Sequence, residues 1–89
     1  MNWKYFKKKP ILIKAFQLTQ SMLTSGELAL IPEVKSVSLT KFKIMTLEGP
    51  VYAKVGDWVL EGVKQEKYPC RKDIFEETYE EHKPVLRRE

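Results

Sequence analysis

The strongest constraint on the fold comes from two alternating segments that are joined by a tight turn. The first segment, residues 41–47 (KFKIMTL), places apolar side chains on one face at the period of two that is typical of a half-buried strand. The second covers residues 51–55, and between them Gly49 suits a turn position that requires a positive φ angle. The sequence therefore predicts an antiparallel hairpin over residues 41–55.

Shorter patterns predict further elements before the hairpin. Residues 11–18 are apolar on both faces, which favours a strand that is central or covered by a helix. Residues 21–30 predict a short or broken helix, because Gly26 lowers the helix propensity of that segment. Residues 34–39 fit either a thin edge strand or a loop.

A Gly-Asp pair marks a second turn directly before another apolar strand. Gly56 and Asp57 are typical turn residues. We expect this turn to direct Trp58 and Leu60 into a small core, and Gly62 to end the strand.

The last two elements follow from Pro69 and Asp73. The segment around Pro69 predicts an edge strand, because proline lacks the N–H group that a central strand donates. Asp73 suits a helix N-cap, and the short helix that follows would carry Phe75 and Tyr79. Residues 78–80 also fit a strand.

These elements together predict a small α+β domain. Its centre would be a curved antiparallel sheet of four or five strands, with one or two short helices on a face or at an end. The length of 89 residues suits one domain with a modest core. We expect residues 1–9 to form a basic aromatic arm or a first strand, residues 10–80 to form the domain, and residues 81–89 to form a loose tail.

Composition argues against several classes of protein. No apolar run approaches the ~18 residues of a membrane span. The basic start of the chain precedes only three consecutive apolar residues, too few for a secretory signal. A single cysteine cannot form an internal disulfide, and one cysteine with one histidine cannot complete a structural zinc site. We therefore expect a cytoplasmic protein without a metal or a cofactor.

Groups that could perform catalysis are sparse. Cys70 precedes two basic residues that can lower the pKa of a thiol, but a buried strand end explains it more simply, and no residue is evident to orient His82. Asp57 and Glu61 have a spacing that puts them on one face of a strand, where a solvated pair of carboxylates is the simpler reading. The glycines match neither the dinucleotide fingerprint nor the P-loop. We predict that the protein is not an enzyme.

Nucleic acid is the ligand that the residue pattern itself favours most. Trp3, Tyr5 and Phe6 alternate with the lysines of the arm, which combines stacking platforms with charges that neutralise phosphates. These lysines are Lys4, Lys7, Lys8 and Lys9, and lysines that could extend the patch over a sheet are Lys14, Lys41, Lys43 and Lys54. An aromatic first strand that covers the core would explain the three aromatic residues equally well. The acidic segment 73–81 argues against a purely basic surface and fits a protein-docking surface or a solvated helix.

A third possibility is a pocket in the sheet that holds a small nucleotide-like ligand. Its walls would be the aromatic side chains of Tyr52, Trp58 and Tyr68.

Several short motifs over residues 9–80 resemble a family of small uncharacterised phage and prophage proteins. They run in order as Lys9-Pro10 with the strand that ends at Leu18, Thr46-Leu47-Glu48-Gly49, Gly56-Asp57-Trp58-Val59-Leu60, Gly62-Val63, Tyr68-Pro69-Cys70, Asp73-Ile74-Phe75 and Thr78-Tyr79-Glu80. The chain departs from this pattern at Gln65, where the family usually has glycine, so we expect a longer or looser loop over residues 63–67.

The resemblance implies a biological context more than a chemistry. It predicts a protein of an infected or lysogenic bacterium that binds a host or phage macromolecule stoichiometrically, for example to inhibit a host enzyme or a defence system. A protein partner is the first expectation and nucleic acid is the alternative.

Overall fold

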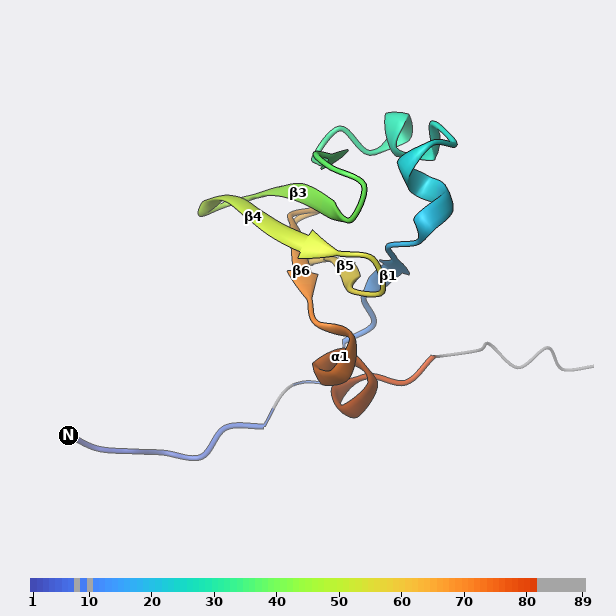
Figure 1. Ribbon diagram of the computed structural model, residues 1–89. Helices are drawn as coiled ribbons and strands as arrows, with labels where there is room; N and C mark the ends of the chain where they lie inside the picture. Colours follow the sequence, from blue (N-terminus) through green and yellow to red (C-terminus); the bar gives the residue numbers. More distant parts are fainter. Residues whose placement is uncertain (8, 10, 82–89) are drawn as a thin grey trace, which may run out of the picture.

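The computed structural model describes residues 1–7, 9 and 11–81, and it contains two three-stranded antiparallel sheets (Figure 1). The first sheet has the order β1-β5-β6, from Lys14–Gln17 (β1), Trp58–Glu61 (β5) and Lys67–Cys70 (β6). The second has the order β2-β3-β4, from Val34–Ser36 (β2), Lys41–Thr46 (β3) and Gly49–Lys54 (β4). The predicted α+β class is therefore confirmed, but the single sheet of four or five strands is replaced by six strands in two sheets.

The predicted hairpin is β3 and β4. They pair from Lys41 opposite Lys54 to Thr46 opposite Gly49, and Gly49 has a φ angle of 108°. The segment that fitted a strand or a loop forms β2, which pairs with β3 along its other edge. The strand expected over residues 11–18 is shorter, because only its second half pairs with β5.

The Gly-Asp turn is the corner that joins the two sheets. Gly56 has a φ angle of 101°, which a residue with a side chain rarely adopts. The N–H of Gly56 donates to the carbonyl oxygen of Leu18, and the N–H of Leu18 donates to the carbonyl of Asp57, both at 2.8 Å. The turn is thus bonded to the end of β1, and it moves the chain from β4 in one sheet to β5 in the other.

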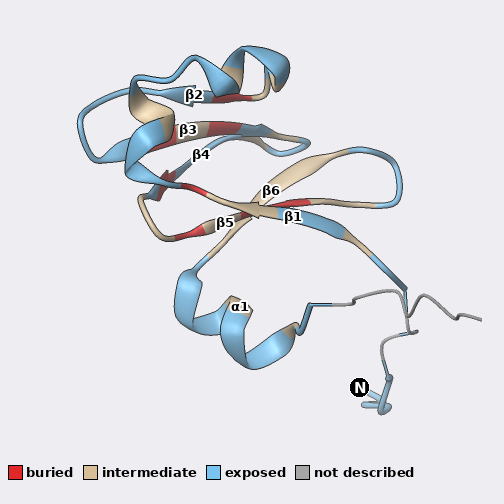
Figure 2. Ribbon diagram, turned by 90° about the vertical axis from the view of Figure 1, so that its right-hand side faces the viewer, coloured by how far each residue is buried: buried red, intermediate tan, exposed pale blue. Residues whose placement is uncertain are grey.

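The main core lies between the two sheets, which form two layers of the molecule (Figure 2). Its fully buried side chains come from both layers and from the residue after β1: Leu18, Val34, Phe42, Ile44, Ala53 and Val59. Two short 3-10 helices, Gln20–Leu23 (η1) and Glu27–Leu30 (η2), add half-buried apolar side chains at the margin of this core. Gly26 separates them in the left-handed conformation, so the predicted helix is broken as its glycine indicates.

Helix α1, Lys72–Thr78, forms a third layer on the opposite face of the β1-β5-β6 sheet (Figure 2). The prediction that Asp73 is its N-cap is wrong, because Arg71 occupies that position and Asp73 lies in the first turn. The helix ends at Thr78, and residues 79–80 do not continue as a strand.

The side chain of Trp58, at the start of β5, packs against helix α1 and not in the main core. Neighbouring residues of a strand face opposite sides of the sheet, so Val59 enters the core while Trp58 and Leu60 face α1. Leu60 is buried there, and Trp58 is half-buried and stacks on Phe75 at a centroid distance of 4.1 Å. Tyr79 extends the stack, 5.1 Å from Phe75. Leu60 is therefore buried as predicted, but Trp58 is only half-buried, and both lie on the α1 side of the sheet and outside the main core.

Candidate functional site

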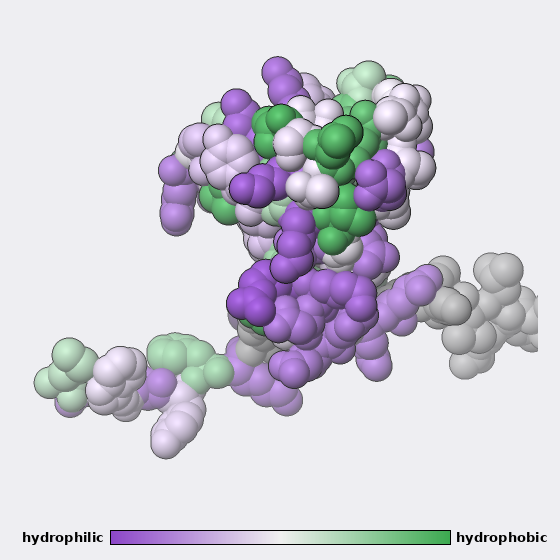
Figure 3. Space-filling model, in the orientation of Figure 1, coloured by the Kyte–Doolittle hydropathy of each residue, from purple (hydrophilic) through white to green (hydrophobic). Residues whose placement is uncertain are grey.

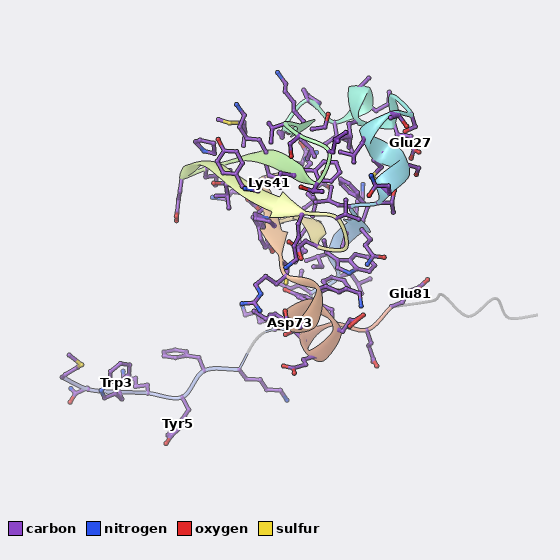
Figure 4. All side chains as sticks on the ribbon, in the orientation of Figure 1. Trp3, Tyr5, Glu27, Lys41, Asp73 and Glu81 are labelled. Carbon is purple, nitrogen blue, oxygen red and sulfur yellow. The ribbon has the colours of Figure 1, made fainter. Side chains whose placement is uncertain are left out.

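Four lysines and a tyrosine share the outer face of the β2-β3-β4 sheet, and we call these five residues the lysine face. Directly opposed residues of antiparallel strands lie on the same side of a sheet. The register opposes Lys35 to Lys43, Lys43 to Tyr52, and Lys41 to Lys54. The alternate residues of the same strands, including Phe42 and Ile44, are buried in the core. The alternation that builds the core therefore also presents these lysines outward (Figure 4 labels Lys41 on β3).

The positive charge of the lysine face is not neutralised within the described part of the chain. The ion pairs found there belong to other lysines and arginines, and none includes Lys35, Lys41, Lys43 or Lys54. Lys41 opposite Lys54 and Lys35 opposite Lys43 are like-charged cross-strand pairs, which destabilise a sheet. The face therefore concentrates cations at a small cost to the fold, and a bound anion would remove that cost.

Apolar surface accompanies these charges. Tyr52 is 60% exposed on β4, an edge strand of this sheet, and Met45, which is 45% exposed, follows Lys43 on the same side of β3. Glu48 lies beyond them in the turn of the hairpin. The arrangement offers an exposed ring beside several lysines, which suits planar anionic ligands.

The N-terminal arm does not form the first strand that was one of its two expected structures. It runs away from the two sheets (Figure 1), and Trp3, Tyr5 and Phe6 are 87%, 104% and 89% exposed. Lys7 and Lys9 are exposed on the same segment, and Lys8 lies outside the described residues. Trp3 and Tyr5 project from the extended arm far from Lys41 on the sheet (Figure 4).

The three aromatic residues predicted to form one pocket are not brought together. Tyr52 projects from the outer face of β4. Trp58 lines a groove beside α1, and Tyr68 lines a separate hollow near the tip of the β3-β4 hairpin. Lys14, the remaining lysine of the predicted patch, lies in the other sheet, 3.8 Å from Glu61.

Asp57 has a structural role in the fold. Its carboxylate is buried and accepts two backbone hydrogen bonds, from Lys54 N–H at 3.1 Å and from Lys72 N–H at 3.2 Å. Glu61 instead pairs with Lys67 at 2.9 Å. The hydrogen bond to Lys67 lowers the pKa of Glu61, and the same bond raises the pKa of Lys67. The two carboxylates thus have separate partners and do not form the solvated pair expected from their spacing.

The remaining predicted positions are structural or lie outside the described chain. Cys70 is half-buried at the end of β6, opposite Trp58, and His82 is outside the described residues. Pro69 lies on an edge strand, as predicted.

Gly62 has no positive φ angle, and it begins a tight turn in which its carbonyl accepts a hydrogen bond from Gln65 N–H at 3.0 Å. Among residues 1–7, 9 and 11–81, no group of three or more histidine, cysteine, aspartate or glutamate side chains could hold a metal ion.

Lys35 was not predicted from the sequence as a site residue. Its segment was assigned to a strand or a loop, and without the pairing of β2 to β3 nothing placed it next to Lys43. The signal that could have found it is the pattern Val34-Lys35-Ser36, in which a single apolar residue precedes an outward-facing lysine.

The fold and the lysine face define a small α+β domain with one exposed basic sheet surface. No protein-family model, no curated protein and no solved structure matches the chain. The resemblance to small phage proteins therefore stays a prediction. Within the described residues, no helix is both long and apolar enough to cross a membrane.

Proposed function

We propose that this protein is a binding module without catalytic activity and that the lysine face holds single-stranded nucleic acid. The observation that carries the proposal is the placement of Tyr52 among four lysines that form no ion pair within the described chain. Proteins that bind single strands combine positive charge along the backbone with aromatic rings on which bases stack. Both parts are present on this one sheet face.

A single strand suits this surface better than a duplex does. A base that is not paired can stack flat on an exposed ring such as Tyr52, whereas the bases of a duplex are already stacked on one another. Lys43 lies directly opposite Tyr52 on the neighbouring strand, about 4.7–4.9 Å away, and Lys54 follows two residues later on β4, so lysines can reach the backbone next to a base stacked on the ring.

The proposal is a specific form of the macromolecule binding predicted from the sequence. The nucleic-acid-binding surface in this proposal is the sheet and not the N-terminal arm, because the fold fixes the positions of the charges on the sheet. A phage or prophage context and a cytoplasmic location are compatible with it and remain part of the proposal. A protein with an acidic surface is the alternative ligand, and it is favoured if neither oligonucleotide in the test below binds at low salt.

Fluorescence anisotropy with a labelled oligothymidylate and an oligouridylate tests the proposal. Each phosphate contact on a single strand contributes about −0.7 to the slope of log K against log salt, so four lysines predict a slope near −2.8 between ~50 mM and ~200 mM salt. Lys41→Ala or Lys54→Ala should lower the magnitude of the slope by about 0.7. Tyr52→Leu should weaken binding roughly 5- to 150-fold, which corresponds to ~1–3 kcal/mol of stacking, and leave the slope unchanged.

Two controls make this result specific. Lys64→Ala removes an exposed lysine from the turn after β5, outside the lysine face, and should leave both affinity and slope as they are. Deletion of residues 1–9 removes the arm and should retain most of the binding. The proposal is wrong if neither oligonucleotide binds at low salt, or if the arm deletion abolishes binding while the Lys41 and Lys54 variants bind normally.

A further inference from the structure

A groove lies between the start of β1 and helix α1, on the side of the molecule away from the lysine face. One wall is formed by residues 11–15, and the other by Trp58, Phe75 and Tyr79 with the two glutamates that follow, Glu80 and Glu81. Its volume is about 760 Å³. The stacked rings make one wall apolar and flat, and the glutamates make its end acidic.

Two features of this groove indicate that it is built to receive more chain. The β1 strand is at the edge of its sheet and pairs only with β5 in the described structure, so its outer edge can accept a further strand. The Nε1 group of Trp58 is buried and has no hydrogen-bond partner among the described residues. Buried polar groups without a partner are uncommon, and a backbone carbonyl of an added segment is a suitable acceptor after a small shift of its neighbours.

The N-terminal arm has the complementary chemistry. Trp3, Tyr5 and Phe6 are almost fully exposed, which is unusual for large apolar side chains that follow one another closely. The arm also carries four lysines, at positions 4, 7, 8 and 9, whereas the segment 73–81 carries five carboxylates. In Figure 3 hydrophilic side chains cover α1, while the arm beside it shows hydrophobic patches between hydrophilic ones.

Within one molecule the arm leaves its own groove. Ile11 and Leu12 line the groove, so the arm begins at the rim, and residues 1–7 then run away from α1 (Figure 1). In a two-fold arrangement of two copies, the arm of each could enter the groove of the other, which buries both sets of aromatic rings and satisfies both charge patterns.

We propose that two copies of this chain associate by exchanging their N-terminal arms, with each arm bound in the groove between β1 and α1 of the other copy. The contact needs no part of the lysine face, so it is independent of the nucleic-acid binding proposed above.

Sedimentation velocity and light scattering on the full chain, without nucleic acid, test the exchange from about 5 µM to 500 µM protein. We expect the mass to rise with concentration from 10.5 kDa toward twice that value. The triple substitution W3S/Y5S/F6S, on side chains that are almost fully exposed in one copy, should weaken association at least tenfold. Lys64→Glu and Glu48→Lys, which change charge outside the groove and the arm, are the controls and should leave the association unchanged.

Charge reversal distinguishes exchange between copies from an arm that folds back on its own groove. We expect K7E/K9E alone and E80K/E81K alone to weaken association about tenfold at low salt, because each places like charges together. Mixing the two variants should restore a heterodimer, since each arm then meets a groove of opposite charge in the partner. A chain that stays at the mass of one copy at 500 µM would overturn the proposal, and so would association that the arm variants leave within twofold of the original.

Discussion

Asp57 caps helix α1 from a distance of fifteen residues, because its Oδ1 atom accepts a hydrogen bond of 3.2 Å from the N–H of Lys72. Its Oδ2 atom accepts a second bond from Lys54 N–H at 3.1 Å. The Gly-Asp turn therefore connects three parts of the fold: the end of β4, the end of β1 and the start of the helix. The Gly-Asp motif, which the sequence predicts as a turn, is thus a structural junction between these elements.

This relationship gives the first prediction. Asp57→Ala should lower the free energy of unfolding by roughly 2–4 kcal/mol, because two backbone N–H groups lose a charged acceptor and one of them begins a helix. Asp73→Ala is the matched control, since Asp73 forms only exposed contacts, an ion pair with Arg71 and a hydrogen bond from the N–H of Ile74, and should cost less than about 1 kcal/mol. Urea denaturation of both variants is the measurement. Equal losses would mean that the two backbone bonds of Asp57 contribute no more to stability than the exposed contacts of Asp73.

The second prediction concerns the stack of Trp58 on Phe75, whose rings are nearly parallel at an interplanar angle of 9°. Trp58→Ala should cost roughly 3–5 kcal/mol and detach α1 from the sheet. Phe75→Ala should also destabilise, and the double substitution should reveal a coupling of about 0.5–1.5 kcal/mol between the rings. Tyr52→Ala, on an exposed ring, is the control and should be close to neutral. Additive losses at Trp58 and Phe75 would show that the stack contributes nothing beyond its buried area.

How far the sequence predicts this fold depends on the range of the interactions involved. The β3-β4 hairpin was predicted correctly because its signals, alternation and a glycine at the turn, lie within fifteen residues. The division into two sheets was not predicted, because it depends on the bonds between Leu18 and the Gly56-Asp57 turn, nearly forty residues along the chain. The N-cap of α1 was predicted wrongly for the same reason. Asp73 was the local candidate, but the carboxylate of Asp57, distant in sequence, accepts the hydrogen bond from the N–H of Lys72.

The candidate site was predictable to a similar degree. Lys41, Lys43 and Lys54 follow from the hairpin pattern, since they alternate with its apolar residues. Lys35 depends on the pairing of β2. Glu33 and Glu61 both form their ion pairs with Lys67, a residue that the sequence alone did not distinguish from its neighbours.

Gln65 gives the third prediction. Its φ angle is 66°, a left-handed conformation that costs a residue with a side chain about 1–2 kcal/mol. The turn after β5 is tight in spite of this, with Gly62 N–H donating to the carbonyl of Glu66 at 2.8 Å, so the expected looser loop over residues 63–67 is not found. Gln65→Gly should therefore raise the free energy of unfolding by roughly 0.5–1 kcal/mol, after the entropy of glycine is subtracted. Lys64→Gly is the control and should destabilise or leave stability unchanged.

The fourth prediction is a dependence of stability on pH that involves Glu61 and Lys67. The pKa of Glu61 is lowered in the fold by its hydrogen bond to Lys67, so its contribution to stability is present above its ordinary pKa and is lost as the pH falls through the lowered value. Glu61→Gln removes this contribution, and the variant should lose less stability than the original chain between about pH 5 and pH 3. Thermal melts across this range give the comparison. Glu77→Gln, at an exposed helix position with no ion pair among the described residues, should retain the original dependence.

The fifth prediction separates stability from binding on the lysine face. Lys54→Glu replaces a like-charged pair with Lys41 by an opposite-charged one, so it should stabilise the sheet by about 0.2–1 kcal/mol. The same change should abolish most oligonucleotide binding, because it removes one phosphate contact and adds a repulsive charge beside Tyr52. Lys72→Glu, which breaks an exposed pair with Glu76 on the far layer, should not affect binding. Denaturation and fluorescence anisotropy on the same samples give the two measurements. If the Lys54→Glu variant loses both stability and binding, Lys54 supports the fold. If it gains stability and loses binding, the unpaired lysines are positions retained for a ligand.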